Sequence, residues 1–130
     1  MCGITGLATA ASAMSEAERR QIVETMSSAI AHRGPDGSGI WHDKAHGICF
    51  GHLRLSIIDL SSAGTQPMTS DDGSVVVTYN GEIYDFSAIR ADLEAAGRKF
   101  RGRSDTEAIA NGIAQWGIEA LCARIGGMFA

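Results

Sequence analysis

The chain has 130 residues, of which 45% are hydrophobic and 20% charged, and its formal net charge is -4. This length and composition predict one soluble domain with enough apolar side chains for a core. The mild acidity argues against nucleic acid as a partner, because phosphate binding needs a concentrated basic face. The cysteines are odd in number and include no CxxC pair, so neither a disulfide framework nor a zinc site is expected; they are Cys2, Cys49 and Cys122.

No stretch approaches the roughly 20 apolar residues that span a bilayer. The first residues also lack the basic and apolar pattern of a signal peptide. We therefore expect a cytoplasmic protein that makes no membrane contact.

The first predicted elements are a strand over residues 2–9 and a helix over residues 15–31. Small and apolar residues alternate in the strand. Ser15 and Glu18 form a capping box at the start of the helix, where a hydroxyl and a carboxylate satisfy free backbone amides. Apolar residues then recur along the helix at a spacing of four, which is the helical period; they are Ile22, Met26 and Ile30.

Residues 32–39, HRGPDGSG, are rich in Gly and Pro and predict a loop. Residues 39–43 and 46–55 follow as two strand-like runs, and we expect a hairpin that turns at residues 43–45. Residues 55–68 begin as a short apolar run and end in residues typical of loops.

Residues 74–80, SVVVTYN, have the β-branched density of a buried strand. The following NGEIYD is expected to break that strand. Phe86, Ile89 and Leu93 mark a second helix, which Gly97 ends in the C′ position.

A third helix is predicted to begin with a capping box of Ser104 and Glu107. Its apolar side carries Ile109, Ile113 and Trp116. Gly117 ends it, residues 118–125 form one further short helix, and the last residues, GGMFA, begin another strand. Grouped strands with short turns favour an α+β fold with a mainly antiparallel sheet.

Cys2 is the first candidate for chemistry. Removal of the initiator methionine leaves a free α-amine on the residue that carries the thiol. With a reference pKa of about 7.7–8.0, that amine is able to act as the base for its own nucleophile. The alternative from position alone is a small buried residue.

Asn80 and Gly81 offer a side-chain amide and a backbone N–H at a strand end, the pair of donors that an oxyanion hole needs. The same dipeptide is also a common hairpin turn. Arg54, between apolar residues, suits a substrate carboxylate or a structural ion pair. Asp105 suits an ammonium group, or a structural place at a helix start. The four histidines show no metal-ligand spacing and are expected in loops or strands; they are His32, His42, His46 and His52.

Five blocks of the sequence occur in the order found in class II glutamine amidotransferases: CGITG, HRGPDGSG, GHLRLSIIDLSSAGTQPM, VVVTYNGEIYDF and RSDTEAI. The resemblance covers nearly the whole chain. Within the class, the chain is similar to the glutaminase half of glutamine-hydrolysing asparagine synthetases.

The resemblance implies a role for each matching residue. Cys2 is the nucleophile that attacks the carboxamide of L-glutamine and forms a γ-glutamyl thioester, and Asn80 with the Gly81 amide is the oxyanion hole. Arg54 binds the α-carboxylate of the substrate, while Asp105 with Glu82 binds its α-ammonium group. Backbone groups of Leu55, Ser56, Ile57 and Ile58 line the same pocket.

The fold implied by the resemblance is the N-terminal nucleophile hydrolase architecture, an αββα sandwich of two antiparallel sheets. Residues 1–130 would be the N-terminal part of that domain, without its last strands and without the synthetase domain. ATP and magnesium are expected only in that absent domain, which amidates aspartate, so no cofactor and no metal are expected in this chain.

Three questions stay open at the level of sequence. The chain is either an active glutaminase or an inactive truncated domain that serves as a binding module. The amide acceptor is aspartate or another compound. The sequence does not determine the oligomeric state, which leaves a homodimer open.

Overall fold

The computed structural model describes residues 2–56 and 62–130. They form two compact units, each of which is discontinuous in sequence. Unit 1 comprises Met1–Leu55, Thr65–Pro67 and Thr78–Asn80. Unit 2 comprises the remaining segments: Ser56–Gly64, Met68–Val77 and Gly81–Ala130.

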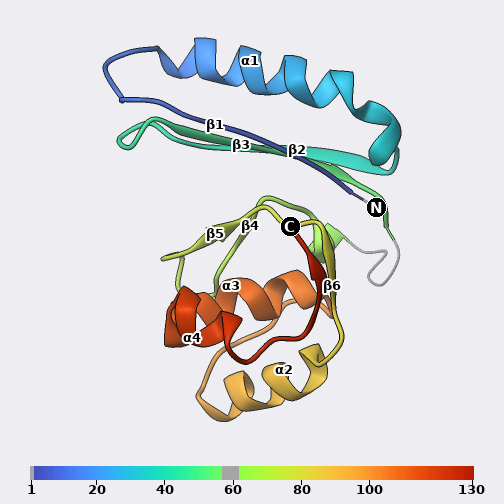
Figure 1. Cartoon of the computed structure of the whole chain (residues 1–130). Helices are drawn as coiled ribbons and strands as arrows, with labels where there is room; N and C mark the ends of the chain where they lie inside the picture. Colours follow the sequence, from blue (N-terminus) through green and yellow to red (C-terminus); the bar gives the residue numbers. More distant parts are fainter. Residues whose placement is uncertain (1, 57–61) are drawn as a thin grey trace. The chain divides into compact units, whose positions relative to one another are not determined.

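Unit 1 is a three-stranded antiparallel sheet with one helix along it (Figure 1). The strands stand in the order β1-β3-β2, so that β3 (Ile48–Arg54) lies between β1 (Gly3–Ala8) and β2 (Gly37–Asp43). Helix α1 (Glu16–Ala29) packs on β1 and β3, and the short 3₁₀ helix η1 (Ala31–Arg33) follows it. The predicted strand at residues 2–9 and the predicted hairpin are confirmed.

Helix α1 begins with the predicted capping box. The Glu18 N–H donates to Ser15 Oγ at 3.3 Å, and the Ser15 N–H donates to the Glu18 carboxylate at 2.8 Å. The predicted apolar stripe is not the buried one, however. Ile22 and Met26 are 38% and 40% exposed, and the buried residues of α1 are Arg19, Val23 and Ser27.

The reason for this rotation of α1 lies in the strands beneath it. A Cβ atom at Gly51 of β3 would overlap Thr5 Oγ1 and come within 2.8 Å of Ser27 Oγ and Val23 Cγ1. The helix therefore approaches the sheet closely over a glycine. The Thr5 and Ser27 hydroxyls share a hydrogen bond of 2.9 Å there, which satisfies two polar groups at the interface.

The loop predicted over residues 32–39 is only partly a loop. It contains most of η1, and β2 already begins at Gly37. This difference arises because pairing with β3 already starts at residue 37: Gly37 stands opposite Arg54, and Gly39 stands opposite His52. The glycines that indicated a loop are strand residues because β3, a strand distant in sequence, provides their hydrogen-bonding partners.

Within its described residues, unit 2 contains two short antiparallel pairs of strands and most of the helices. β4 (Met68–Thr69) pairs with β5 (Val76–Val77), and β6 (Gly81–Ile83) pairs with β7 (Gly127–Phe129). The helical elements are η2 (Ser62–Gly64), α2 (Phe86–Ala95), α3 (Asp105–Trp116) and α4 (Ile118–Cys122). Helix α3 packs against α2, α4, β4 and β5.

The strand predicted over residues 74–80 is wrong for most of its length. Only Val76 and Val77 lie in a strand, and the expected break NGEIYD contains β6. The Tyr79 N–H donates to Gln66 Oε1 at 2.7 Å, and the Tyr79 carbonyl accepts from His52 Nε2 at 3.2 Å. Side chains therefore take the backbone bonds that a strand ladder would use.

The predicted helix ends are largely confirmed. Gly97 follows the C-cap of α2 with φ +91°, a conformation that favours glycine. Ser104 caps α3 by accepting from the Thr106 N–H. The Glu107 carboxylate, expected to bond back to Ser104, accepts instead from the N–H groups of Arg101 and Gly102 at 2.7 and 3.0 Å.

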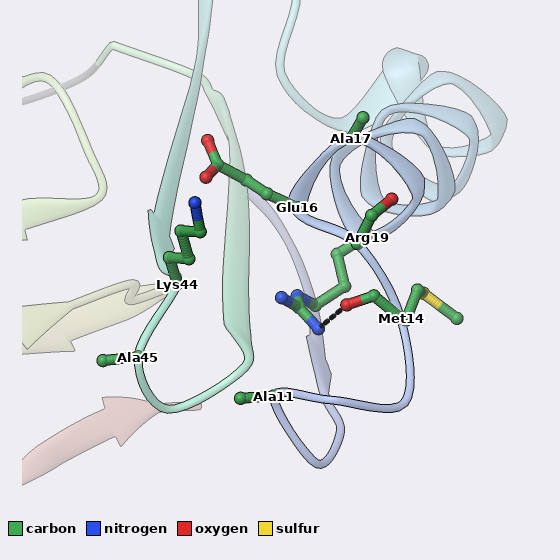
Figure 2. A pocket seen from close by; sticks show the side chains of 8 residues that line it. Ala11, Met14, Glu16, Ala17, Arg19, Lys44 and Ala45 are labelled. Carbon is green, nitrogen blue, oxygen red and sulfur yellow. Dashed lines mark hydrogen bonds between the residues drawn. The ribbon is translucent and has the colours of Figure 1, made fainter.

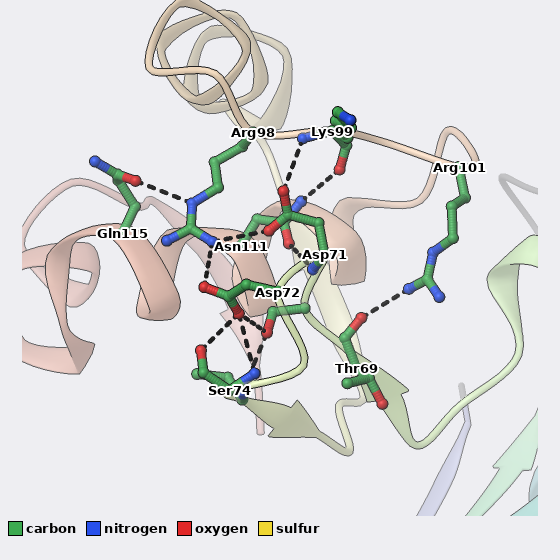
Figure 3. Close-up of polar contacts among 11 residues, drawn as sticks. Thr69, Asp71, Asp72, Ser74, Arg98, Lys99, Arg101, Asn111 and Gln115 are labelled. Carbon is green, nitrogen blue, oxygen red and sulfur yellow. Dashed lines mark hydrogen bonds and ion pairs between the residues drawn. The ribbon is translucent and has the colours of Figure 1, made fainter.

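A polar network joins the β4–β5 turn to the segment before α3 (Figure 3). The Arg98 guanidinium donates to Asp71 and Asp72 at 2.8 and 2.6 Å. Hydrogen bonds from Ser74 and Arg98 hold the pKa of Asp72 well below its usual range. The buried Asn111 of α3 accepts from the Asp71 N–H and donates to the Lys99 carbonyl.

Helices and antiparallel strands in both units confirm the expected α+β class. No helix within residues 2–56 and 62–130 is long and apolar enough to cross a membrane.

Candidate active site

Cys2 lies just before β1, and its thiol is held by the backbone that follows β3. The Leu55 N–H donates to Cys2 Sγ at 3.3 Å, and the thiol donates to the Leu55 carbonyl at 3.6 Å. Cys2 is half-buried. The thiol therefore lies beside Leu55, one residue after Arg54.

Cys49 and Cys122 differ from Cys2 in their surroundings. Cys49 is fully buried, and burial raises the pKa of its thiol, which disfavours the nucleophilic thiolate. Cys122 is exposed near the end of α4.

The HRGPDGSG segment packs against this same end of the sheet. The Arg33 Nε donates to the Cys2 carbonyl at 3.2 Å, and the Asp36 N–H donates to the Arg54 carbonyl at 3.0 Å. A Cβ atom at Gly34 would overlap the backbone of Leu53. Glycine is therefore required for the loop to come this close to β3.

The register of β1 and β3 defines which residues share a face of the sheet. Gly3 stands opposite Leu53, and Ile4 stands opposite His52. Val23 and Ser27 of α1 lie over Gly51, so alternation places His52 and Arg54 on the opposite face. The pairing ends at Gly3 and Leu53, and Cys2 and Arg54 are the next residues beyond that pair.

The segment Thr78–Asn80 belongs to this unit and is fixed to β3. The Thr78 hydroxyl donates to the Gly51 carbonyl at 3.4 Å, and His52 Nε2 donates to the Tyr79 carbonyl. Burial lowers the pKa of His52, the hydrogen bond to Tyr79 opposes that shift, and the charge of Arg54 adds to it. The imidazole is therefore neutral at pH 7.

Gly81 and Glu82 lie in β6, opposite Phe129 and Met128 of β7. A Cβ atom at Gly81 would overlap the Met128 carbonyl oxygen, so only glycine allows this pairing without displacement. Both residues are exposed.

Asp105, at the start of α3, is bonded to the same strand β6. Its Oδ2 accepts from the Ile83 N–H at 3.2 Å, and its Oδ1 accepts from the Thr106 N–H at 2.9 Å. The residue is 6% exposed. Asp105 therefore fixes the strand that carries Gly81 and Glu82.

The predicted site residues divide between the two units. Cys2, Arg54, Leu55 and Asn80 belong to unit 1. Ser56, Gly81, Glu82 and Asp105 belong to unit 2. The predicted pocket residues Ile57 and Ile58 lie outside the described residues.

Sequence reasoning treated His52 only as a strand or loop residue and did not single out Gln66. His52 is 1% exposed and Gln66 is 6% exposed. The available signal was the spacing of His52 and Arg54, which places both on one face of a strand. Gln66 gave no local signal, because its partner Tyr79 is 13 residues away.

A separate pocket lies between the start of α1 and the β2–β3 turn (Figure 2). Lys44, Glu16 and Arg19 line it, and the Arg19 guanidinium donates to the Met14 carbonyl at 2.6 Å. No predicted site residue lines it. Cys2 and this pocket lie beyond opposite ends of β1.

In the part of the chain that the structure describes, no group of three or more His, Cys, Asp or Glu side chains is placed to hold a metal ion.

The whole chain, residues 1–130, matches a family described as "Glutamine amidotransferase domain". It is 38% identical over 130 residues to the glutamine-hydrolyzing asparagine synthetase 1 of Bacillus subtilis, and 42% identical over 131 residues to the glutamine-hydrolyzing asparagine synthetase 2 of Oryza sativa subsp. japonica. These alignments cover 100% of this chain but 20% and 21% of the two relatives.

A third relative, named amidase chry2, comes from Gibberella zeae. It is 40% identical over 116 residues, which cover 84% of this chain and 17% of the relative. The chain thus spans about one fifth of the length of the curated relatives it matches.

Proposed function

The chain belongs to the glutamine amidotransferase domain family, and from this membership we propose that it hydrolyses L-glutamine to glutamate and ammonia, with Cys2 as the nucleophile. The ammonia serves an amidation carried out by the remainder of a longer protein, which in asparagine synthetases acts on aspartate.

The proposed reaction begins after removal of the initiator methionine. The α-amine of Cys2 accepts the thiol proton, and Sγ attacks the side-chain carbonyl carbon of glutamine. Asn80 Nδ2 and the Gly81 N–H donate to the oxyanion that forms. The α-ammonium group returns its proton to the leaving nitrogen, and the C–N bond breaks. Ammonia departs, and a γ-glutamyl thioester remains on Cys2.

Water completes the proposed reaction. The α-amine of Cys2 accepts a proton from water, and the resulting hydroxide adds to the thioester carbonyl carbon. The C–S bond then breaks, glutamate leaves, and the α-ammonium group returns its proton to Sγ, which regenerates the thiol of Cys2. No cofactor takes part in either half.

Charged residues account for recognition of the amino-acid part of glutamine. Arg54 has a guanidinium that suits the α-carboxylate, while Glu82 and Asp105 carry the negative charge that suits the α-ammonium group. Backbone groups of Leu55, Ser56, Ile57 and Ile58 complete the pocket. The bond from Ile83 to Asp105 supports this assignment, because it ties the carboxylate to the strand of Glu82.

The observation that carries the proposal is the place of the Cys2 thiol. It lies against the Leu55 backbone at the end of β3, immediately after Arg54. The thiol that we propose as the nucleophile therefore contacts the residue that follows the proposed carboxylate-binding cation.

The wider setting of the reaction is also part of the proposal. The longer protein binds ATP and magnesium in a separate synthetase domain and works in the cytoplasm. This chain contacts L-glutamine and that domain, and it contacts neither nucleic acid nor membrane. Whether two copies pair as a homodimer is a matter for a mass measurement in solution.

The test compares Cys2→Ser with Cys122→Ser. Glutamate release from L-glutamine is measured with purified chain whose N-terminus has been read by mass spectrometry. Cys2→Ser should lower the rate by at least about 10³-fold, since the nucleophile and its base act as one unit. Cys122→Ser, an exposed thiol substitution, should keep the wild-type rate.

Labelling with 6-diazo-5-oxo-norleucine provides the matching chemical readout, and the adduct should map to Cys2. Retained turnover in Cys2→Ser would refute the proposal. Absence of glutamate release from folded, methionine-trimmed wild type would favour the non-catalytic alternative, a binding module.

A second candidate concerns the acceptor rather than the glutaminase step. The relative from Gibberella zeae is named an amidase rather than an asparagine synthetase and is 40% identical, so a longer protein that carries such a domain need not act on aspartate. Feeding the longer protein with ATP, glutamine and either aspartate or alternative carboxylates, followed by mass spectrometry of the amide, distinguishes the two.

A further inference from the structure

We propose that His52 is a positioning residue for the glutaminase reaction: its imidazole fixes the Tyr79 peptide and thereby sets the place of the oxyanion donor Asn80. This inference rests on the proposed function for the role of Asn80. The contacts of His52 themselves belong to unit 1.

Both backbone groups of Tyr79 are held by side chains. His52 Nε2 donates to the Tyr79 carbonyl at 3.2 Å, and Gln66 Oε1 accepts from the Tyr79 N–H at 2.7 Å. His52, Gln66 and Tyr79 are 1%, 6% and 5% exposed. The two peptide groups that flank the Tyr79 Cα atom are thus each bonded and have little freedom to shift, because each lost bond would leave a buried polar group unpaired.

The Tyr79 peptide leads directly into Asn80. Its carbonyl belongs to the amide bond whose nitrogen is that of Asn80. A planar peptide transmits the position of its carbonyl to the next Cα atom. Holding the Tyr79 carbonyl therefore fixes the origin of the Asn80 side chain.

The tautomer of His52 follows from the contact with Tyr79. A carbonyl oxygen accepts only, so Nε2 carries the proton and the neutral ring has an unprotonated Nδ1. Nδ1 is buried and has no hydrogen-bond partner within the described residues. An unpaired buried nitrogen costs free energy, so packing alone does not account for a histidine at this position.

The strand that carries His52 also positions the nucleophile. Leu55, just after β3, binds the Cys2 thiol, and β3 pairs with β1 from Gly3 onward. Cys2 and the Tyr79 carbonyl are thus both held by β3 or by the residue that follows it. A change in the His52 contact moves Asn80 relative to Cys2, and a shift of about 1 Å in a catalytic geometry costs on the order of 10²-fold in rate.

The test uses two amide side chains of different length. His52→Gln places an amide nitrogen near the position of Nε2 and keeps a donor for the Tyr79 carbonyl. His52→Asn is shorter and loses it. The turnover number of His52→Asn should fall about 10–100-fold with KM within about twofold, because an oxyanion donor acts on the transition state. His52→Gln should recover most of the rate.

Introducing His52→Asn into an Asn80→Ala chain distinguishes a positioning role of His52 from a purely packing role. If His52 acts through Asn80, the loss caused by His52→Asn should disappear in the Asn80→Ala chain. Additive losses would overturn the inference, as would a wild-type turnover number in His52→Asn.

Two measurements do not depend on activity. Long-range ¹H–¹⁵N NMR of the wild-type imidazole should show the Nε2–H tautomer, and an Nδ1–H tautomer would overturn the inference even if the variants fail to fold. Hydrogen exchange at residues 78–81 should be about tenfold faster in His52→Asn than in His52→Gln, with β1 and β3 unchanged. Equal exchange there would also overturn it.

These outcomes are distinguishable from failure of the proposed function. A wild-type chain that releases no glutamate refutes the glutaminase proposal. The tautomer and the exchange rates then decide by themselves whether His52 holds the segment before Gly81.

Discussion

Several buried ionisable side chains among the described residues hold backbone groups that lie outside regular ladders. His52 holds the Tyr79 carbonyl, Asp105 holds the Ile83 N–H, and Glu107 holds the N–H groups of Arg101 and Gly102. Buried backbone groups need partners, and these segments obtain them from side chains. Segments next to the proposed oxyanion donors are therefore fixed without long strands.

His52 should make the stability of the chain depend on pH. Its pKa is lowered in the folded chain, chiefly by burial, so the unfolded chain binds the proton more readily. Stability is then full above the unfolded pKa of about 6.5 and is lost as the pH falls through that value towards the lowered folded pKa. Urea unfolding between pH 7.5 and pH 5 should show a smaller loss for His52→Gln than for wild type.

Parallel stability curves for the two proteins would contradict this expectation. The comparison removes only the titration of His52, because Gln keeps a polar side chain at the same position. The other histidines stay in place in both proteins and contribute equally to each curve.

At the scale of elements, the β6–β7 pair depends on two glycines, each of which faces the backbone of the opposite strand. Cβ atoms at Gly81 and Gly127 would overlap the Met128 and Glu82 carbonyl oxygens. Gly126 is different, since a Cβ there would lie 3.4 Å from Asp85 Oδ2, an ordinary contact. Gly126 and Gly127 are therefore a matched pair of positions at which to compare substitution by alanine.

Gly127→Ala should lower the free energy of unfolding by about 1–3 kcal/mol, the usual cost of forcing an added methyl into a packed contact. Gly126→Ala should stay within about 0.5 kcal/mol of wild type. Urea midpoints measure both. Equal midpoints for the two variants would mean that the close approach of β6 and β7 does not limit stability.

The elements that local sequence predicts well are those with local partners. The capping box of Ser15 and Glu18 and the helix stop at Gly97 depend on residues within a few positions. The strand over residues 74–80 was wrong because Tyr79 bonds to Gln66 and His52, 13 and 27 residues away. The buried stripe of α1 was missed because Gly51, far along the chain, sets the helix orientation.

The candidate site also combines features that the local sequence predicts with features that depend on distant partners. A terminal cysteine and an arginine after a strand are visible in the sequence. Their adjacency is not, because it depends on the pairing of β1 with β3 and on a contact between Cys2 and Leu55 across 53 positions. The roles proposed for Glu82 and Asp105 come from the resemblance to a family, because spacing alone left them open.

At the scale of the whole molecule, the two units are interleaved in sequence. The chain passes from one unit to the other five times, at 55/56, 64/65, 67/68, 77/78 and 80/81. The segments that carry Gln66 and Tyr79 belong to unit 1 but are flanked on both sides by unit 2. Unfolding of unit 2 would release both ends of these segments.

The two tryptophans report on the two units separately. Trp41 of β2 stacks on Phe50, and Trp116 of α3 lies under the Arg124 guanidinium. The single-tryptophan variants Trp41→Phe and Trp116→Phe should give fluorescence transitions in urea with coincident midpoints. Circular dichroism of each variant measures how far the substitution itself shifts the midpoint, and this shift is subtracted. Two well-separated transitions would show that the units unfold independently.

The pairing of Gly81 with Phe129 has a consequence for synthesis of the protein on the ribosome. The partner strand of Gly81 is made 129 − 81 = 48 residues later. At about 5–20 residues per second, that interval lasts roughly 2–10 s. A nascent chain therefore exposes β6 for several seconds before its partner strand β7 has been made.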